Sequence, residues 1–157
     1  MKANEHSELL NAAIKCLSYR PYSGHELKQK LVKKGYVPEE VDDVIDKLTA
    51  EKLINDAEYA RSILRHNLHK GNSAIKRKFT DKGISKELFQ PVLDDSQPEI
   101  ERARLAAEKK WPKIRKEDSR KRMESLGRFL ASRGFSPKSV YTILSEYKTG
   151  SEESGEC

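Results

Sequence analysis

Residues 55–85 read NDAEYARSILRHNLHKGNSAIKRKFTDKGIS, and this stretch decides the fold. Apolar residues recur at three- and four-residue spacing, which predicts one helix before Gly71 and a second helix after it. Gly71 predicts a tight turn, and Gly83 predicts the end of the second helix. Between Arg61 and Lys86, eight lysines and arginines stand against one acidic residue. The stretch therefore predicts a strongly basic pair of helices.

The closing pattern of this stretch also occurs before and after it. When Gly35, Gly83 and Gly134 are aligned without gaps, a basic residue precedes each glycine and an apolar residue follows it. Apolar residues also stand four and eight positions before each glycine, and the glycines are 48 and 51 residues apart. These spacings predict a three-helix unit repeated three times, with each glycine at positive φ. A single compact bundle with coincidental glycine stops is the alternative.

We expect an all-α fold made of three tandem three-helix repeats that form an elongated, curved helical array. The expected first repeat, with an N-terminal helix, covers residues 1–54. The second, central and basic repeat covers residues 55–95, and the third covers residues 96–148. Residues 149–157 are rich in Gly, Ser and Glu and predict a disordered tail.

The composition favours thin helical units with an anionic partner. Of 157 residues, 36% are charged, 36% are apolar and 7% are aromatic. The net charge of +6 indicates nucleic acid or an acidic protein surface as a partner. Cys16 and Cys157 do not form the pattern of a disulfide framework, and the N-terminus lacks an apolar signal segment. These features predict a cytoplasmic protein with no membrane association.

The charges are divided into blocks along the chain. Residues 37–58 hold eight acids against two lysines, whereas residues 109–122 hold eight basic residues against two acids. Arg61 and Arg65 share a helix face and repel each other, which favours a surface that meets an anion. A solvated basic face is the alternative. Three aromatic residues are candidates for base stacking, although the last two also fit a core: Tyr22, Tyr36 and Trp111.

The sequence carries no pattern that indicates catalysis, a metal or a cofactor. It has no glycine-rich phosphate loop. His66 and His69 could share a helix face, but no third metal ligand has suitable spacing. The carboxylates of Asp42, Asp43 and Asp46 fit a solvated helix face better than a Mg²⁺ site. We therefore expect a protein that is not an enzyme.

Short motifs follow one another in a defined order over about residues 8–148: Glu26-Leu27, Lys33-Lys34-Gly35-Tyr36, Leu53-Ile54-Asn55-Asp56, Tyr59-Ala60, Lys70-Gly71, Ile75, Lys82-Gly83-Ile84, Arg128-Phe129-Leu130 and Arg133-Gly134-Phe135. In order and spacing, these motifs resemble the RecX family of bacterial regulators of the recombinase RecA. Two positions depart from the family pattern: at the turn after Lys70-Gly71, Asn72-Ser73 replaces an aromatic and a second glycine, and Asn55-Asp56 replaces an acidic pair.

The resemblance implies a non-enzymatic, monomeric regulator that binds in the groove of the RecA filament on single-stranded DNA. Such a protein restrains the ATPase and strand-exchange activity of RecA, and so modulates homologous recombination, DNA repair and the SOS response. Binding to single-stranded DNA alone is expected to be weak and independent of sequence. A free-standing helix-turn-helix DNA-binding regulator is the alternative. The candidates for contact with RecA or DNA are Arg61, Arg65, His69, Lys70, Lys76, Arg77, Lys82, Arg122, Arg128 and Arg133.

Overall fold

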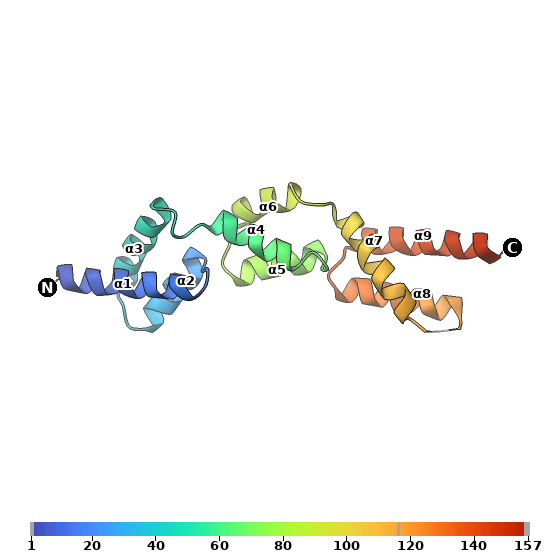
Figure 1. Ribbon diagram of the computed structural model, residues 1–157, viewed down its shortest axis with the longest axis horizontal. Coiled ribbons are helices and arrows are strands. Elements are labelled where there is room, and N and C mark those ends of the chain that lie inside the picture. Colours follow the sequence, from blue (N-terminus) through green and yellow to red (C-terminus); the bar gives the residue numbers. More distant parts are fainter. Residues whose placement is uncertain (1, 116, 156–157) are drawn as a thin grey trace. The chain divides into compact units, whose positions relative to one another are not determined.

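The computed structural model describes residues 2–115 and 117–155, and within these ranges the chain is helical without a strand (Figure 1). The all-α expectation is confirmed. The α-helices are α1 (Lys2–Tyr19), α2 (Gly24–Lys33), α3 (Pro38–Ala50), α4 (Asp56–His66), α5 (Asn72–Asp81), α6 (Lys86–Asp94), α7 (Glu99–Lys110), α8 (Ser119–Ser132) and α9 (Pro137–Gly155), with a 3₁₀ helix, η1, at Trp111–Lys113.

Helices α1, α2 and α3 surround one apolar core. The alternation of apolar and charged residues at helical spacing gives each helix one apolar stripe, and the three stripes face each other. Leu9, Leu27, Leu31, Val44 and Leu48 are each 0% exposed. Burial of each such side chain contributes about 1.5–3 kcal/mol, so this core is the main stabilising element of the first three-helix repeat.

Local signals in the sequence begin and end these helices as expected. The Ser23 hydroxyl accepts a hydrogen bond from the Glu26 N–H, and the Glu26 carboxylate accepts one from the Ser23 N–H, which completes a capping box before α2. Three helices end at glycines with positive φ, as expected for a residue without a Cβ: Gly35 at 105°, Gly83 at 73° and Gly134 at 86°.

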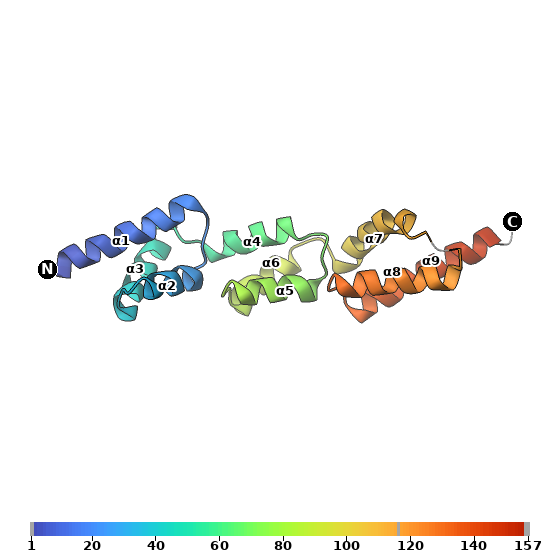
Figure 2. The same cartoon turned by 90° about the horizontal axis from the view of Figure 1, so that it is seen from below.

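Helices α7, α8 and α9 lie side by side and enclose a second core (Figures 1 and 2). Ala103 and Ala107 of α7 are fully buried against Leu126 and Leu130 of α8 and Ile143 of α9. The small alanine side chains let α7 approach its neighbours closely. This packing joins α7, α8 and α9 around one core.

The chain divides into two compact units. The first unit comprises residues 1–63 and 79–92, and the second comprises residues 64–78 and 93–157. The central segment thus contributes to both units. The repeat boundaries at residues 54, 95 and 148 remain predictions.

In the first unit, the end of α5 contacts the start of α2. The Ser23 hydroxyl donates a hydrogen bond to the carbonyl of Lys82, and the Lys82 ammonium lies 3.6 Å from the Glu26 carboxylate. The Gly24 N–H donates to the Asp56 carboxylate at 3.0 Å. A Cβ on Gly83 would collide with His25. The lack of a side chain at Gly83 therefore allows α5 to approach α2 closely, in addition to ending α5.

Two helix boundaries differ from the sequence expectation. Helix α1 begins at Lys2, before the amphipathic pattern of residues 7–19 that indicates a helix in the sequence, and α9 runs to Gly155 through most of the segment expected to be disordered. Residues 156–157 of that segment lie outside the described residues. None of the helices within the described ranges combines the length and apolar character needed to cross a bilayer.

Candidate nucleic-acid interface

The turn between α4 and α5 carries His69 and Lys70, and it is held in the second unit by backbone hydrogen bonds. The Gly71 N–H donates to the Arg133 carbonyl at 2.8 Å, and the Ser73 N–H donates to the Gly134 carbonyl at 3.3 Å. Because Gly71 is buried against the backbone of Gly134, a side chain at this position would prevent the contact. The turn is thereby fixed to the end of α8.

Arg102 of α7 holds the same turn from the other side. Arg102 is 2% exposed, and its guanidinium donates hydrogen bonds to the carbonyl of Lys70, to the side-chain oxygen of Asn72 and to the carbonyl of Gln97. Burial lowers the pKa of Arg102, and the nearby Glu99 carboxylate acts in the opposite direction. These bonds compensate for the loss of hydration of a buried charge.

Glu99, the first residue of α7, receives hydrogen bonds at both carboxylate oxygens. The Asn72 N–H donates to one oxygen at 2.7 Å, while the Ser136 and Ser139 hydroxyls donate to the other at 2.6 and 2.7 Å. Burial favours a raised pKa, but the hydrogen bonds from Ser136, Ser139 and the Asn72 N–H lower the pKa of Glu99 below its ordinary value. Glu99 thus joins the first turns of α5 and α9.

This framework brings five basic side chains from four elements together. Burial, followed by Lys70, Arg133, Lys78 and Lys109, lowers the pKa of His69. Burial, followed by Lys78 and Arg133, also lowers the pKa of Lys70. In both groups, burial and then the repulsion of neighbouring positive charges oppose protonation and so lower the pKa. The electrostatic environment favours an anion.

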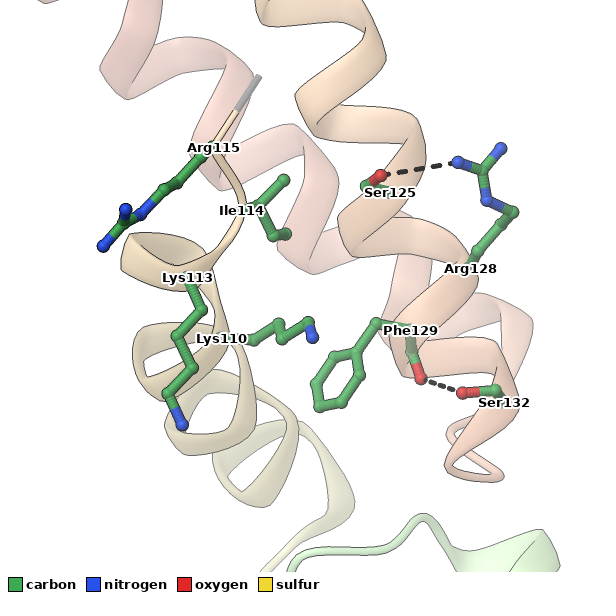
Figure 3. A pocket seen from close by; sticks show the side chains of 8 residues that line it. All are labelled: Lys110, Lys113, Ile114, Arg115, Ser125, Arg128, Phe129 and Ser132. Atoms are coloured by element: carbon green, nitrogen blue, oxygen red, sulfur yellow. Dashed lines mark hydrogen bonds between the residues drawn. The ribbon is translucent and has the colours of Figure 1, made fainter.

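Two neighbouring cavities of about 210 and 520 Å³ open beside this cluster between α7 and α8. His69, Lys109 and Arg133 line the smaller cavity, Arg115 and Arg128 line the larger one, and both are lined by Lys110, Lys113 and Phe129. Figure 3 shows the Lys110 ammonium directed at the Phe129 ring, with Arg115 and Arg128 extending on opposite sides. The ammonium lies 5.1 Å from the ring centre, and the Arg133 guanidinium lies 5.2 Å from it. We call this region the α7–α8 cleft.

The structure brings four of the sequence candidates to this region: His69, Lys70, Arg128 and Arg133. The side chains of three other candidates are exposed on the surfaces of α4 and α5: Arg65, Lys76 and Arg77.

Three candidates are engaged by other groups of the chain. The Arg61 guanidinium lies 3.0 Å from the Glu58 carboxylate, so its charge is compensated within α4, contrary to the expectation of uncompensated repulsion with Arg65. Lys82 pairs with Glu26 as described above. Arg122 stacks 3.8 Å from the centre of the Trp111 ring and donates to the Trp111 carbonyl at 2.8 Å.

Sequence reasoning did not nominate several residues of the cleft. The basic run 109–122 was the available signal for Lys109, Lys110 and Lys113, but it did not distinguish residues that face the cleft from those that do not. Tyr22, a candidate for base stacking, is only 7% exposed and lies under the Arg20 guanidinium. The aromatic residue of the cleft is instead Phe129, whose apolar spacing on α8 resembles that of a core residue.

Comparison with known proteins gives a consistent result along the chain. Sequence profiles of the first and third three-helix domains of RecX match residues 10–48 and 97–144. The regulatory protein RecX of Vibrio parahaemolyticus is 32% identical over 137 residues, which cover 85% of this chain and 88% of that protein. The crystal structure of RecX from Lactobacillus salivarius superposes with a TM-score of 0.83 at 28% identity, covering 94% of this chain and 99% of that chain. A second crystal structure, of a regulatory protein RecX, gives a TM-score of 0.80 at 26% identity, covering 92% of this chain and 75% of that chain.

Proposed function

This chain belongs to the RecX family of regulatory proteins, and from this premise we propose that it regulates the recombinase RecA. In this proposal it binds, as a monomer in the cytoplasm, in the groove of the filament that RecA forms on single-stranded DNA. Binding restrains ATP hydrolysis and strand exchange, and thereby modulates homologous recombination and DNA repair. The protein acts by occupying the filament and not by catalysing a reaction.

The similarity to RecX over nearly the whole chain is the observation that carries the proposal. It includes the first and third three-helix domains, and it extends to a solved structure matched over 94% of this chain. A filament groove is a long surface, so a regulator that binds in it needs several units that present contacts in series. The similarity covers such a series of units and is not confined to one motif.

The charge distribution supports a partner made of protein and DNA together. Lysines and arginines line the α7–α8 cleft, which suits the phosphates of DNA or an acidic protein loop. Helix α3 instead exposes Glu39, Asp42, Asp43 and Asp46, which suits a basic protein surface. Opposite charges on one chain match a complex whose own surface alternates in charge.

The proposal is tested by measuring ATP hydrolysis by the cognate RecA on single-stranded DNA while this protein is titrated in. We expect suppression at well below one molecule of this protein per RecA, because one bound molecule affects filament growth beyond its own contacts. Undiminished hydrolysis at stoichiometric concentration would contradict the proposal. Tight, sequence-selective binding to duplex DNA in a parallel anisotropy titration would favour a helix-turn-helix regulator instead.

A further inference from the structure

The α7–α8 cleft concentrates positive charge. Among the described residues that line its two cavities, none is acidic. Two exposed arginines elsewhere in the same unit do have carboxylate partners: Arg104 lies 2.7 Å from Glu146, and Arg120 lies 3.5 Å from Glu124. The positive charge of the cleft is therefore a local property of this surface. The cations are Lys109, Lys110, Lys113, Arg115, Arg128 and Arg133.

The two cavities adjoin each other and share lining residues, so the positively charged surface extends over both of them. Lys110, Lys113 and Phe129 line both of them, so the basic surface extends from His69 to Arg128 along the groove between the helices. An isolated anion needs one such cavity. A chain of regularly spaced phosphates can use both, and a groove that follows the backbone is the usual form of a single-strand binding site.

Phe129 supplies a feature that a purely electrostatic surface lacks. Its ring is half-buried in the wall of the cleft, with the Lys110 ammonium and the Arg133 guanidinium about equally distant from its centre at 5.1 and 5.2 Å. A partly exposed aromatic ring beside cations can stack with a base while the cations hold the adjoining phosphates. The carboxylates of an acidic peptide would contact the cations and not the aromatic ring.

We propose that the α7–α8 cleft binds single-stranded DNA, with consecutive phosphates on its lysines and arginines and a base against Phe129. The inference rests on the proposed function for the choice of single-stranded DNA as the nucleic acid. Binding is independent of sequence, because the cations contact phosphates and every base has a face that can stack. The helices of the cleft lie in the third three-helix domain, and the turn that carries His69 lies in the same compact unit.

The test is a fluorescence-anisotropy titration of a labelled oligothymidylate at several salt concentrations. The triple variant Lys109→Gln, Lys113→Gln, Arg133→Gln should bind about tenfold more weakly at physiological salt. The slope of log affinity against log salt should fall by about 2, because each phosphate contact on a single strand contributes about 0.7. Phe129→Leu keeps an apolar side chain in the core but removes the ring, and should weaken binding about fivefold with the slope unchanged.

A control variant with the same net charge separates the cleft from general electrostatics. Lys121→Gln, Lys138→Gln, Lys148→Gln removes three exposed lysines of the same unit that do not line the cleft. It should bind DNA within about twofold of the unmodified protein. Equal weakening by both triple variants would overturn the inference. Circular dichroism and the urea midpoint verify that each variant is folded.

The outcomes also distinguish this inference from the proposed function. Unchanged DNA binding by the cleft variants, with suppression of the RecA ATPase intact, would overturn the inference alone. Cleft-dependent DNA binding without any effect on RecA would support the inference and contradict the proposed function. The cleft substitutions could instead weaken the binding of polyglutamate and leave the binding of oligothymidylate unchanged. That result would assign the cleft to an acidic protein segment and overturn the inference.

Discussion

At the scale of single residues, His69 links the charge of the cleft to pH. Burial and the charges of Lys70, Arg133, Lys78 and Lys109 lower its pKa, so its imidazole is more often neutral than an ordinary histidine at the same pH. A phosphate bound in the smaller cavity would reduce the repulsion and raise the pKa. At a pH between the pKa of His69 in the free protein and its pKa in the complex, binding is therefore accompanied by the uptake of a proton.

We expect the affinity for oligothymidylate to rise as the pH falls from about 8 to about 6, by about threefold to tenfold, because one unit of pKa shift corresponds to a factor of ten. The measurement is the dissociation constant by anisotropy across this range at constant ionic strength. His69→Gln should remove most of the dependence, whereas His66→Gln, at an exposed position of α4 that does not line either cavity, should retain it. An equally steep dependence in His69→Gln would contradict the prediction.

Glu99 is a second residue whose charge has a defined consequence. The hydrogen bonds that lower its pKa stabilise the folded state only while the carboxylate is ionised. This contribution is fully present above the pKa of the unfolded chain, about 4.3, and is lost as the pH falls through the lower pKa of the folded state. In Glu99→Gln an amide group replaces the oxygen that accepts the Asn72 N–H.

Glu99→Gln should therefore reduce the free energy of unfolding by about 1.5–3 kcal/mol at neutral pH, the range for hydrogen bonds to charged groups. The difference from the unmodified protein should stay constant down to about pH 5 and narrow at lower pH. Urea unfolding at a series of pH values measures it. Glu101→Gln, at an exposed position of the same helix, is the control and should change stability by less than about 0.5 kcal/mol.

At the scale of helices, two glycines illustrate two different constraints. Gly35 ends α2 at a φ of 105° with no heavy atom within 4 Å of the position of a Cβ, so the backbone conformation alone favours glycine. Gly71 precedes α5 without a positive φ, but a Cβ there would overlap the backbone of Gly134 and Phe135. The first constraint is local, and the second depends on the approach of α5 to α8.

We expect Gly71→Ala to destabilise the protein more than Gly35→Ala. The left-handed conformation costs an alanine about 1–2 kcal/mol at position 35. At position 71 the two helix ends must separate, with the loss of the Gly71–Arg133 hydrogen bond, which costs about 3 kcal/mol or more. Urea unfolding midpoints of both variants measure the order, and a smaller effect at Gly71 would contradict the close approach.

At the scale of the whole molecule, the central segment is shared between two compact units. Its α4–α5 turn belongs to the second unit, and the end of α5 belongs to the first unit. In each unit a carboxylate from the start of one helix accepts the first N–H of another: Asp56 that of Gly24, and Glu99 that of Asn72. The repeated sequence thus carries a repeated junction, which the glycine alignment alone did not show.

The helical content, the glycine stops and the capping box were predictable from the sequence because each depends on residues within a few positions of one another. The resemblance to the RecX family could also be recognised from the sequence, since the motifs are short and occur in a defined order along the chain. Arg102 and Glu99 were not recognised, because a buried arginine and an ordinary helix-start glutamate have the same local pattern as exposed ones. Phe129 was overlooked for the same reason.

The sequence by itself determined which segments are helices, where the helices that end at Gly35, Gly83 and Gly134 stop, and that the chain is basic in blocks. Only the tertiary structure decided which basic residues act together: it paired Arg61 and Lys82 with carboxylates, packed Arg122 on Trp111, and placed no acid among the described residues that line the α7–α8 cleft. Helix formation depends on neighbours along the chain, whereas the effect of a charge depends on its neighbours in space. Those neighbours are set by packing between helices that are distant in sequence.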